Sequence, residues 1–246
     1  MSVPLEATHK GREAAARTRD LHLLRGGAPE IPAPVEGARR VLNVVVAAIL
    51  ITLSLPLWVL IAIAIKLTSR GPVFYTQTRI GLDKRDTGIR DDDPRRRRDL
   101  GGRPFRIYKF RTMRVDAERE TGAVWAAPDD CRTTPIGRVL RLYRIDELPQ
   151  LINVLRGEMN VVGPRPERPP IFEDLRPAIP NYHLRQRARP GITGHAQVNL
   201  QYDTNIEDVR RKVQYDLEYI ARQSFWTDLK IMAQTLPVML FRRGSR

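Results

Sequence analysis

The longest feature of the hydrophobic pattern is an uncharged run over residues 41–65, VLNVVVAAILITLSLPLWVLIAIAI. As a helix that rises about 1.5 Å per residue, this run would extend roughly 37 Å, which is enough to cross a bilayer. Pro56 lies near its middle, where proline removes a backbone hydrogen bond and clashes with the preceding turn. The pattern therefore predicts a membrane-embedded helix with a sharp bend.

Basic residues flank this run on both sides, and their placement bears on its topology. They are Arg39, Arg40, Lys66 and Arg70. Because positive charge marks the cytoplasmic side of a membrane helix, both ends are expected on that side. A re-entrant helix-break-helix over residues 39–70, which enters one leaflet and returns, accounts for the bend and for both flanks. One kinked transmembrane helix and a helix pair buried in a soluble core stay open as alternatives.

The remaining chain divides into a tail and a polar body. Residues 1–38 are rich in Ala, Arg, Gly and Pro and predict a flexible basic tail, with a short helix over 12–24 as an option. Residues 71–246 predict a cytosolic domain. Alternation favours strands within 71–81 and 103–113, the second with Phe105, Ile107 and Phe110 inward. Between them, residues 83–102 carry dense charge of both signs and predict a solvated loop.

Helical periodicity dominates the rest of the body. It appears in residues 133–144, in the LINVL stretch that ends near Gly157, and over residues 207–241. The last stretch is basic and aromatic, so its helices either lie in the lipid headgroup layer or pack on the domain core. The expected fold class is α+β and mostly helical, with a small sheet.

Composition narrows the chemistry. The chain has 246 residues, 42% of them hydrophobic, and carries 42 Lys and Arg against 28 Asp and Glu, a formal charge of +14. Such a basic chain favours anionic partners, whether phosphates, anionic lipids or nucleic acid. The single cysteine, Cys131, excludes a disulfide scaffold, and the four histidines show no metal-ligand spacing, which argues against a zinc enzyme.

A pair of carboxylates, Asp146 and Glu147, lies between two acid-free basic stretches. Asp146 is well placed as the N-cap of the following helix, and a cap alone would explain it. The same position also suits chemistry, because a carboxylate at a helix N-terminus among arginines is kept ionised. It could bind Mg²⁺ beside a phosphate, or attack that phosphate and form an acyl phosphate.

Two turns rich in Pro and Gly each contain an arginine. Residues 162–167 read VGPRPE, with Arg165 between two prolines, and residues 189–194 read RPGITG, with Arg189 first. Arginine offers a planar fork to phosphate oxygens, and prolines lower the entropy that a loop loses when it holds a ligand. Arg165 and Arg189 are therefore candidate phosphate ligands, although such turns are often only structural.

Taken together, these motifs resemble the bacterial sugar transferase family, the monotopic phosphoglycosyl transferases that start polysaccharide and glycoconjugate assembly. The resemblance runs from about Arg39 to Phe241. The motifs that carry it are KLTSRGPVFYTQTRIG (66–81), PFRIYKFRTM (104–113), RTTPIGRVLRLYRIDELPQLINVLRGEMNVVGPRPE (132–167) and RPGITGHAQV (189–198).

The resemblance implies a two-step transfer of substituted phosphate groups. A UDP-sugar would lose UMP as a carboxylate takes the sugar phosphate, and polyprenyl (undecaprenyl) phosphate would then attack that intermediate. Asp146 matches the nucleophile, and Glu147 would assist with Mg²⁺ or with proton transfer. Arg141 and Arg165 match the family's phosphate-contacting arginines, with Lys109 and Arg111 as further candidates.

The resemblance also implies a place in the cell. The enzyme would lie on the cytoplasmic face of the bacterial inner membrane, touch membrane lipid, and work with other polysaccharide-assembly enzymes rather than with nucleic acid. The membrane bend would involve Ser54 and Pro56. The chain departs from the family in having Asn43 where an Asp is common, in having Leu55 directly before the proline, and in its long loop 83–102.

Two other hypotheses stay open. A membrane-tethered binder of nucleic acid or anionic lipid would use the +14 charge, although no nucleic-acid motif is present and aromatic residues are only 7%. An inactive scaffold of the same fold would keep the architecture without the reaction.

Overall fold

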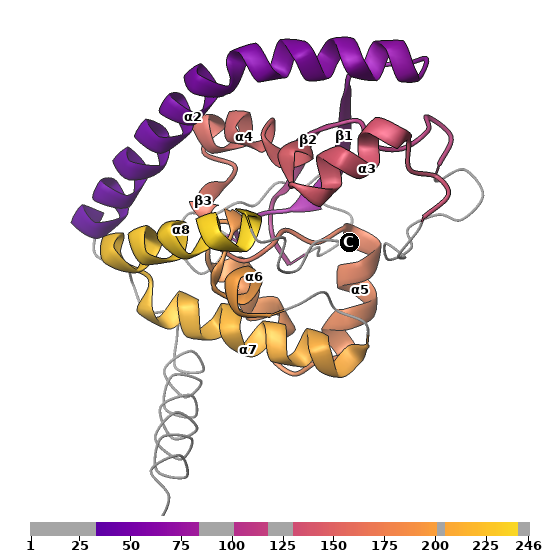
Figure 1. Cartoon of the computed structure of the whole chain (residues 1–246). Helices are drawn as coiled ribbons and strands as arrows, with labels where there is room; N and C mark the ends of the chain where they lie inside the picture. Colours follow the sequence, from indigo (N-terminus) through magenta and orange to yellow (C-terminus); the bar gives the residue numbers. More distant parts are fainter. Residues whose placement is uncertain (1–32, 84–100, 118–129, 201–204, 241–246) are drawn as a thin grey trace, which may run out of the picture.

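The computed structural model describes residues 33–83, 101–117, 130–200 and 205–240 (Figure 1). The predicted tail helix and most of the charged loop lie outside these residues. In chain order the elements are α2 (Ala33–Thr68), β1 (Phe74–Ile80), β2 (Pro104–Phe110), α3 (Pro135–Leu142), η2 (Ile145–Glu147), α4 (Gln150–Arg156), β3 (Asn160–Val162), α5 (Pro169–Ala178), η3 (Tyr182–Arg187), β4 (Gly191–Thr193), α6 (His195–Asn199), α7 (Ile206–Arg222) and α8 (Phe225–Leu240).

The apolar run forms one long helix, α2, which begins before the predicted start at residue 39. Figure 1 shows it as two legs that meet at an angle, and Pro56 lies inside it. The Ser54 hydroxyl donates a 2.6 Å hydrogen bond to the Leu50 carbonyl. A serine that bonds back to the carbonyl four residues earlier favours helix bending, so Ser54 and Pro56 act in the same direction.

Most of α2 is not covered by protein. Only 11% of its most apolar window is buried, and large apolar side chains such as Leu53, Leu60 and Leu67 are 74%, 64% and 82% exposed. A contiguous apolar surface of this kind is typical of a membrane-embedded segment. The alternative of a helix pair buried in a soluble core is therefore wrong.

Polar contacts fix the first leg of α2 to the body. The buried guanidinium of Arg39 donates to Asp228 at 3.0 Å, to Gln223 at 2.8 Å and to the Tyr219 hydroxyl at 2.8 Å. Asn43, which is fully buried, accepts a hydrogen bond from the Val161 amide of β3. The Asn43 departure from the family thus forms a specific link between α2 and β3.

The second leg is fixed mainly by apolar packing. Ile61 and Ile65 pack with Phe110 of β2 and Leu140 of α3, and the Trp58 ring meets the edge of Phe110 at 5.5 Å. Both legs of α2 therefore rest on the same body.

The two predicted strands are confirmed and pair as an antiparallel hairpin, with Phe74 opposite Phe110 and Ile80 opposite Pro104. The inward side chains of β2 divide between two clusters: Phe105 and Ile107 lie in the main core, and Phe110 lies under α2. The expected small sheet is two separate sheets of two strands each, because β3 and β4 pair with each other in parallel and not with β1 or β2.

The predicted helical stretch over residues 207–241 is two helices, α7 and α8. The chain breaks between them at Ser224, whose hydroxyl accepts the Thr227 amide at 3.1 Å and so caps α8. The apolar face of α7 is buried in the main core. In contrast, α8 turns Trp226, Leu229 and Leu236 outward, at 74%, 42% and 63% exposure.

Helix α3 lies unusually close to the end of β2. Thr134 caps it by accepting the Gly137 amide at 3.1 Å. A Cβ placed on Gly137 would meet the Thr112 carbonyl oxygen at 2.0 Å. Because that neighbour is backbone, it cannot move aside as a flexible side chain would.

We expect Gly137→Ala to lower the free energy of unfolding by about 1–3 kcal/mol, the usual cost of overpacking. Gly37→Ala is the matched control, because a Cβ on this helical glycine has nothing within 4 Å. The control should unfold at the same temperature or a higher one, since alanine favours the helix. Fluorescence-detected unfolding in detergent measures both variants, and equal behaviour would contradict the described packing of α3.

Candidate functional site

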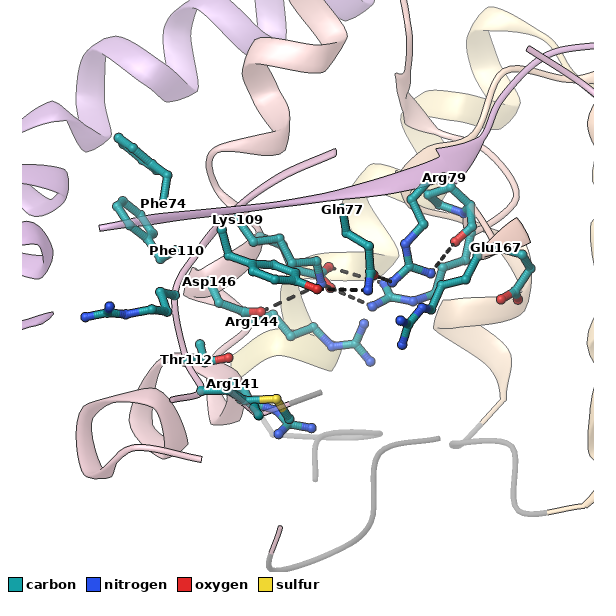
Figure 2. A pocket seen from close by; sticks show the side chains of 18 of the residues that line it. Phe74, Gln77, Arg79, Lys109, Phe110, Thr112, Arg141, Arg144, Asp146 and Glu167 are labelled. Atoms are coloured by element: carbon teal, nitrogen blue, oxygen red, sulfur yellow. Dashed lines mark hydrogen bonds and ion pairs between the residues drawn. The ribbon is translucent and has the colours of Figure 1, made fainter. Parts of the chain in front are cut away.

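A cavity of about 410 Å³ opens between the β1–β2 hairpin, η2 and the loop after β3. Figure 2 shows that the cavity has an aromatic end, a centre with a carboxylate and a lysine, and a far end with an arginine and a glutamate. In that order the labelled residues are Phe74 and Phe110, then Asp146 and Lys109, then Arg79 and Glu167.

The carboxylate pair lies in η2, a single 3₁₀ turn, and not at the start of α4. Arg144 precedes this turn in the left-handed region, with φ of 54°, and α4 begins only at Gln150 after Pro149. The expectation that Asp146 caps the following helix is therefore wrong. The reversal at Arg144 and the 3₁₀ turn instead bury both acids against the cavity wall, at 7% and 6% exposure.

Glu147 is held by two cations from different elements. Lys109 of β2 donates to its Oε1 at 2.8 Å, and Arg165 donates to the same oxygen at 2.6 Å and to Oε2 at 3.3 Å. Burial raises the pKa of this carboxyl, but Arg165 and Lys109 together outweigh it and hold the pKa well below its usual range. Glu147 is accordingly a fixed negative charge.

Asp146 differs from its neighbour in environment. Its Oδ2 is 3.8 Å from the Lys109 ammonium, beyond hydrogen-bond distance. Burial raises the pKa of this carboxyl to about 6, against the opposing charge of Lys109 and with the help of the charge on Glu147. The expected low pKa of Asp146 is thus wrong, because desolvation dominates there and the cations bind Glu147.

Of the other candidate phosphate ligands, Arg141 and Arg165 line the cavity. Arg141 comes from the last turn of α3 and donates to the Thr133 hydroxyl at 3.0 Å. Arg144 also lines it, between Arg141 and the acids in sequence.

Two candidates are placed differently. Arg111 touches the cavity wall, but its guanidinium donates to the Ser69 and Arg70 carbonyls at 2.9 and 2.8 Å and so fixes the end of α2. Arg189 does not line the cavity and pairs with Glu36 at the start of α2. The structure therefore does not bring Arg189 to Asp146.

The two Pro/Gly turns pack directly on each other. The Gly163 amide donates to the Thr193 carbonyl, and the Gly191 amide donates to the Pro164 carbonyl, both at 2.9 Å. A Cβ on Gly163 would meet the Arg189 carbonyl oxygen at 2.3 Å, so glycine is required for this approach. The RPGITG turn supports the turn that presents Arg165.

The chain matches a known protein family over most of its length. The sequence model of the family described as Bacterial sugar transferase matches residues 35–90 and 93–242. The chain belongs to the bacterial sugar transferase family.

Curated relatives in the family are named for different sugars. The chain is 44% identical over 221 residues to a UDP-glucose:undecaprenyl-phosphate glucose-1-phosphate transferase of Caulobacter vibrioides. The matched region covers 88% of this chain and 75% of that protein. It is 39% identical to a UDP-N-acetylgalactosamine-undecaprenyl-phosphate N-acetylgalactosaminephosphotransferase of Aeromonas hydrophila, over 88% of the chain and 47% of that protein. It is also 39% identical to a UDP-glucose:undecaprenyl-phosphate glucose-1-phosphate transferase of Escherichia coli, over 85% of the chain and 43% of that protein.

The far end of the cavity was missed by sequence reasoning. Arg79, Glu167, Arg168 and Lys212 line it. Glu167 lies 3.2 Å from the Lys212 ammonium, and the Arg185 guanidinium lies 3.5 Å from the same oxygen. These residues come from four separate elements or loops, and no local spacing in the sequence connects them.

The donor set fits a magnesium ion only in part. No group of three or more acidic, His or Cys side chains suited to a metal occurs in the part of the chain that the structure describes. Both Glu147 oxygens already accept hydrogen bonds from cations, whereas Asp146 lines the cavity with the Lys109 ammonium 3.8 Å from its Oδ2. Mg²⁺ commonly binds one or two carboxylates together with substrate phosphates. Asp146 with phosphate oxygens would satisfy that pattern.

We expect acid to weaken the far end of the cavity through Glu167. Burial raises the pKa of this carboxyl, but Lys212, Arg185 and Arg79 outweigh burial and lower the pKa from 4.5 to about 2. A depressed folded pKa stabilises the protein above the unfolded pKa, and that stability is lost as pH falls toward the folded pKa.

Between about pH 5 and pH 3, wild-type protein should therefore lose more unfolding free energy than Glu167→Gln. Urea unfolding at a series of pH values measures this difference. Glu207→Gln, at the exposed start of α7, controls for loss of one negative charge. Parallel curves for wild type and Glu167→Gln would contradict the described ion pairs.

Proposed function

We propose that this chain transfers a sugar phosphate from a UDP-sugar to undecaprenyl phosphate through a covalent intermediate on Asp146. The observation that carries the proposal is the contrast between the two adjacent acids. Both acids line a cavity that is rich in cations, but Glu147 accepts three hydrogen bonds from Lys109 and Arg165, whereas the Lys109 ammonium lies 3.8 Å from the Asp146 carboxylate.

The first step would begin with attack of an Asp146 oxygen on the phosphorus that carries the sugar. The new oxygen–phosphorus bond forms as the bond to UMP breaks, and UMP leaves with the electron pair. In the second step, an oxygen of undecaprenyl phosphate attacks the same phosphorus. The acyl phosphate bond then breaks, which restores the Asp146 carboxylate and yields undecaprenyl-diphosphate-sugar.

The cations around the cavity support this chemistry electrostatically. Lys109, Arg141 and Arg144 lie where phosphate oxygens would gather around Asp146. Positioned cations are worth more in a buried site than in water, because the surroundings screen them less. The lowered pKa of Glu147 is unsuited to proton transfer near neutral pH, so we assign it to holding Lys109 and Arg165.

Magnesium would be held by Asp146 together with phosphate oxygens of the donor. When bound, it would neutralise charge on the diphosphate and so lower the cost of bringing an anionic nucleophile to it.

The proposed setting is the cytoplasmic face of the bacterial inner membrane, with α2 re-entrant. Both legs of α2 rest on one body, through Arg39 and Asn43 on the first and through Ile61 and Ile65 on the second. A straight crossing would separate the two ends by a hydrocarbon core of about 30 Å. The outward apolar residues of α8 (Trp226, Leu229 and Leu236) would lie in the headgroup layer.

The sugar itself is left open within UDP-sugars, since the relatives are named for glucose and for N-acetylgalactosamine. The chain spans less than half of the Aeromonas and Escherichia proteins. Enzymes that extend the lipid-linked sugar are the expected downstream partners.

We expect purified protein with Mg²⁺, undecaprenyl phosphate and a panel of UDP-sugars to release UMP with at least one donor. Asp146→Asn should lower that release by at least about 10³-fold, because an amide oxygen is a poor nucleophile and forms no stable acyl phosphate. The variant should bind anionic lipid vesicles as wild type does.

That pair of measurements separates an enzyme from a binder of anionic lipid. A folded wild-type protein that releases no UMP with any donor, yet binds the vesicles, would overturn the proposed reaction.

Topology can be tested by labelling. In a Cys131→Ser background, cysteines introduced at the exposed positions Ala38 and Arg70 should both react with an impermeant maleimide from the cytoplasmic side. Labelling of the exposed Cys131 in the unsubstituted protein is the control that marks the side on which the body lies. Labelling of the two introduced cysteines from opposite sides would establish a crossing helix.

A further inference from the structure

The loop that presents Arg165 has an unusual hydrogen-bonding requirement. Residues 163–167 read GPRPE, and both prolines lack an amide hydrogen. Such a loop has few donors with which to hold itself, so its position depends on what binds its acceptor oxygens.

Every backbone carbonyl from residue 164 to residue 167 accepts a hydrogen bond from outside the loop. Two donors are backbone amides and two are arginine side chains. The pairs are Gly191 N to Pro164 O at 2.9 Å, Arg185 Nη2 to Arg165 O at 3.0 Å, Arg79 Nη1 to Pro166 O at 3.0 Å, and Ile80 N to Glu167 O at 3.0 Å.

Arg185 contacts the loop on both sides of Pro166. One terminal nitrogen, Nη2, donates to the Arg165 carbonyl, and the other lies 3.5 Å from the Glu167 carboxylate. The side chain of Arg185 is 1% exposed and does not line the cavity, so it can reach a ligand only through the loop.

The guanidinium is itself oriented from behind. Its Nε donates to Asp216 of α7 at 2.7 Å, in a pair whose side chains are each 1% exposed, and Nη1 donates to the Tyr182 hydroxyl at 3.1 Å. A buried ion pair adds little net stability over an apolar replacement of the same shape. Its placement beside a loop rich in carbonyls therefore suits a role in geometry.

We infer that Arg185, oriented by Asp216, is a positioning residue for Arg165. It fixes the loop backbone so that the Arg165 fork meets both oxygens of Glu147, and so keeps Lys109 and Glu147 arranged around Asp146. The inference rests on the proposed function, because it concerns the arrangement of that same site.

A double-mutant cycle tests this inference. Arg185→Lys keeps the charge, but a single ammonium cannot meet Asp216 and the Arg165 carbonyl with the same fork. Small displacements at a reacting centre can cost about 100-fold in rate, so we expect a fall of roughly 10- to 100-fold in single-turnover UMP release. Arg165→Lys should cause a similar fall.

The combined variant decides between positioning and general destabilisation. If Arg185 acts through Arg165, the double variant should be no slower than the slower single variant, to within about twofold. Effects on kcat should exceed those on KM for the UDP-sugar. Multiplied effects of the two substitutions would overturn the inference.

Ile231→Val is the matched control for stability. It removes a buried methyl group from α8, outside the contacts described for Arg185 and the loop, so it should lower the unfolding temperature and leave UMP release within about twofold. A fall in turnover equal to that of Arg185→Lys would show that turnover follows stability and would overturn the inference.

Two further outcomes are distinguishable. If Arg185→Lys does not fold, Asp216→Asn takes its place in the same cycle, because it keeps the shape and removes the orienting charge. If wild-type protein releases no UMP, it is the proposed function that fails. If wild-type protein is active and the two substitutions have multiplied effects, it is the positioning role that fails.

Discussion

The arrangement of the site depends on one buried carboxylate, Glu147, held between Lys109 and Arg165. This contact joins three parts of the chain: β2, the η2 turn and the loop after β3. A buried charge without such partners would be strongly unfavourable, so the three parts are held together or the site does not form. As a result, cations lie beside Asp146 although their hydrogen bonds go to Glu147, and the Lys109 ammonium is 3.8 Å from the Asp146 carboxylate.

The same body also anchors the apolar helix at both ends. Arg39 and Asn43 join the first leg to α8 and β3, and Arg111, directly after β2, donates to the Ser69 and Arg70 carbonyls directly after α2. Since β3 leads directly into the turn that carries Arg165, the apolar helix and the acid pair share one framework. This explains why an arginine expected to bind phosphate, Arg111, is used for structure.

Local patterns in the sequence predicted the strands, the bend at Pro56 and the acid pair, because each follows from short-range spacing. They did not predict that Asp146 lies in a 3₁₀ turn, since the left-handed conformation of Arg144 has no signal in its residue type. They also placed the lowered pKa on Asp146, whereas it is the pKa of Glu147 that is lowered and that of Asp146 that is raised. Which cation reaches which carboxylate depends on Lys109 and Arg165, which are 38 and 18 residues from Glu147. Arg185 could not be found for the same reason.

The central claim is that Asp146, and not Glu147, bears the sugar phosphate during turnover. The most direct test is to mix the enzyme with a UDP-sugar labelled at the sugar phosphate, without undecaprenyl phosphate, and to locate the label on quenched peptides by mass spectrometry. The account predicts a labelled peptide with the added mass on Asp146 and its loss on addition of the lipid acceptor. Label on Glu147, or product formed with no labelled peptide at any time, would contradict it.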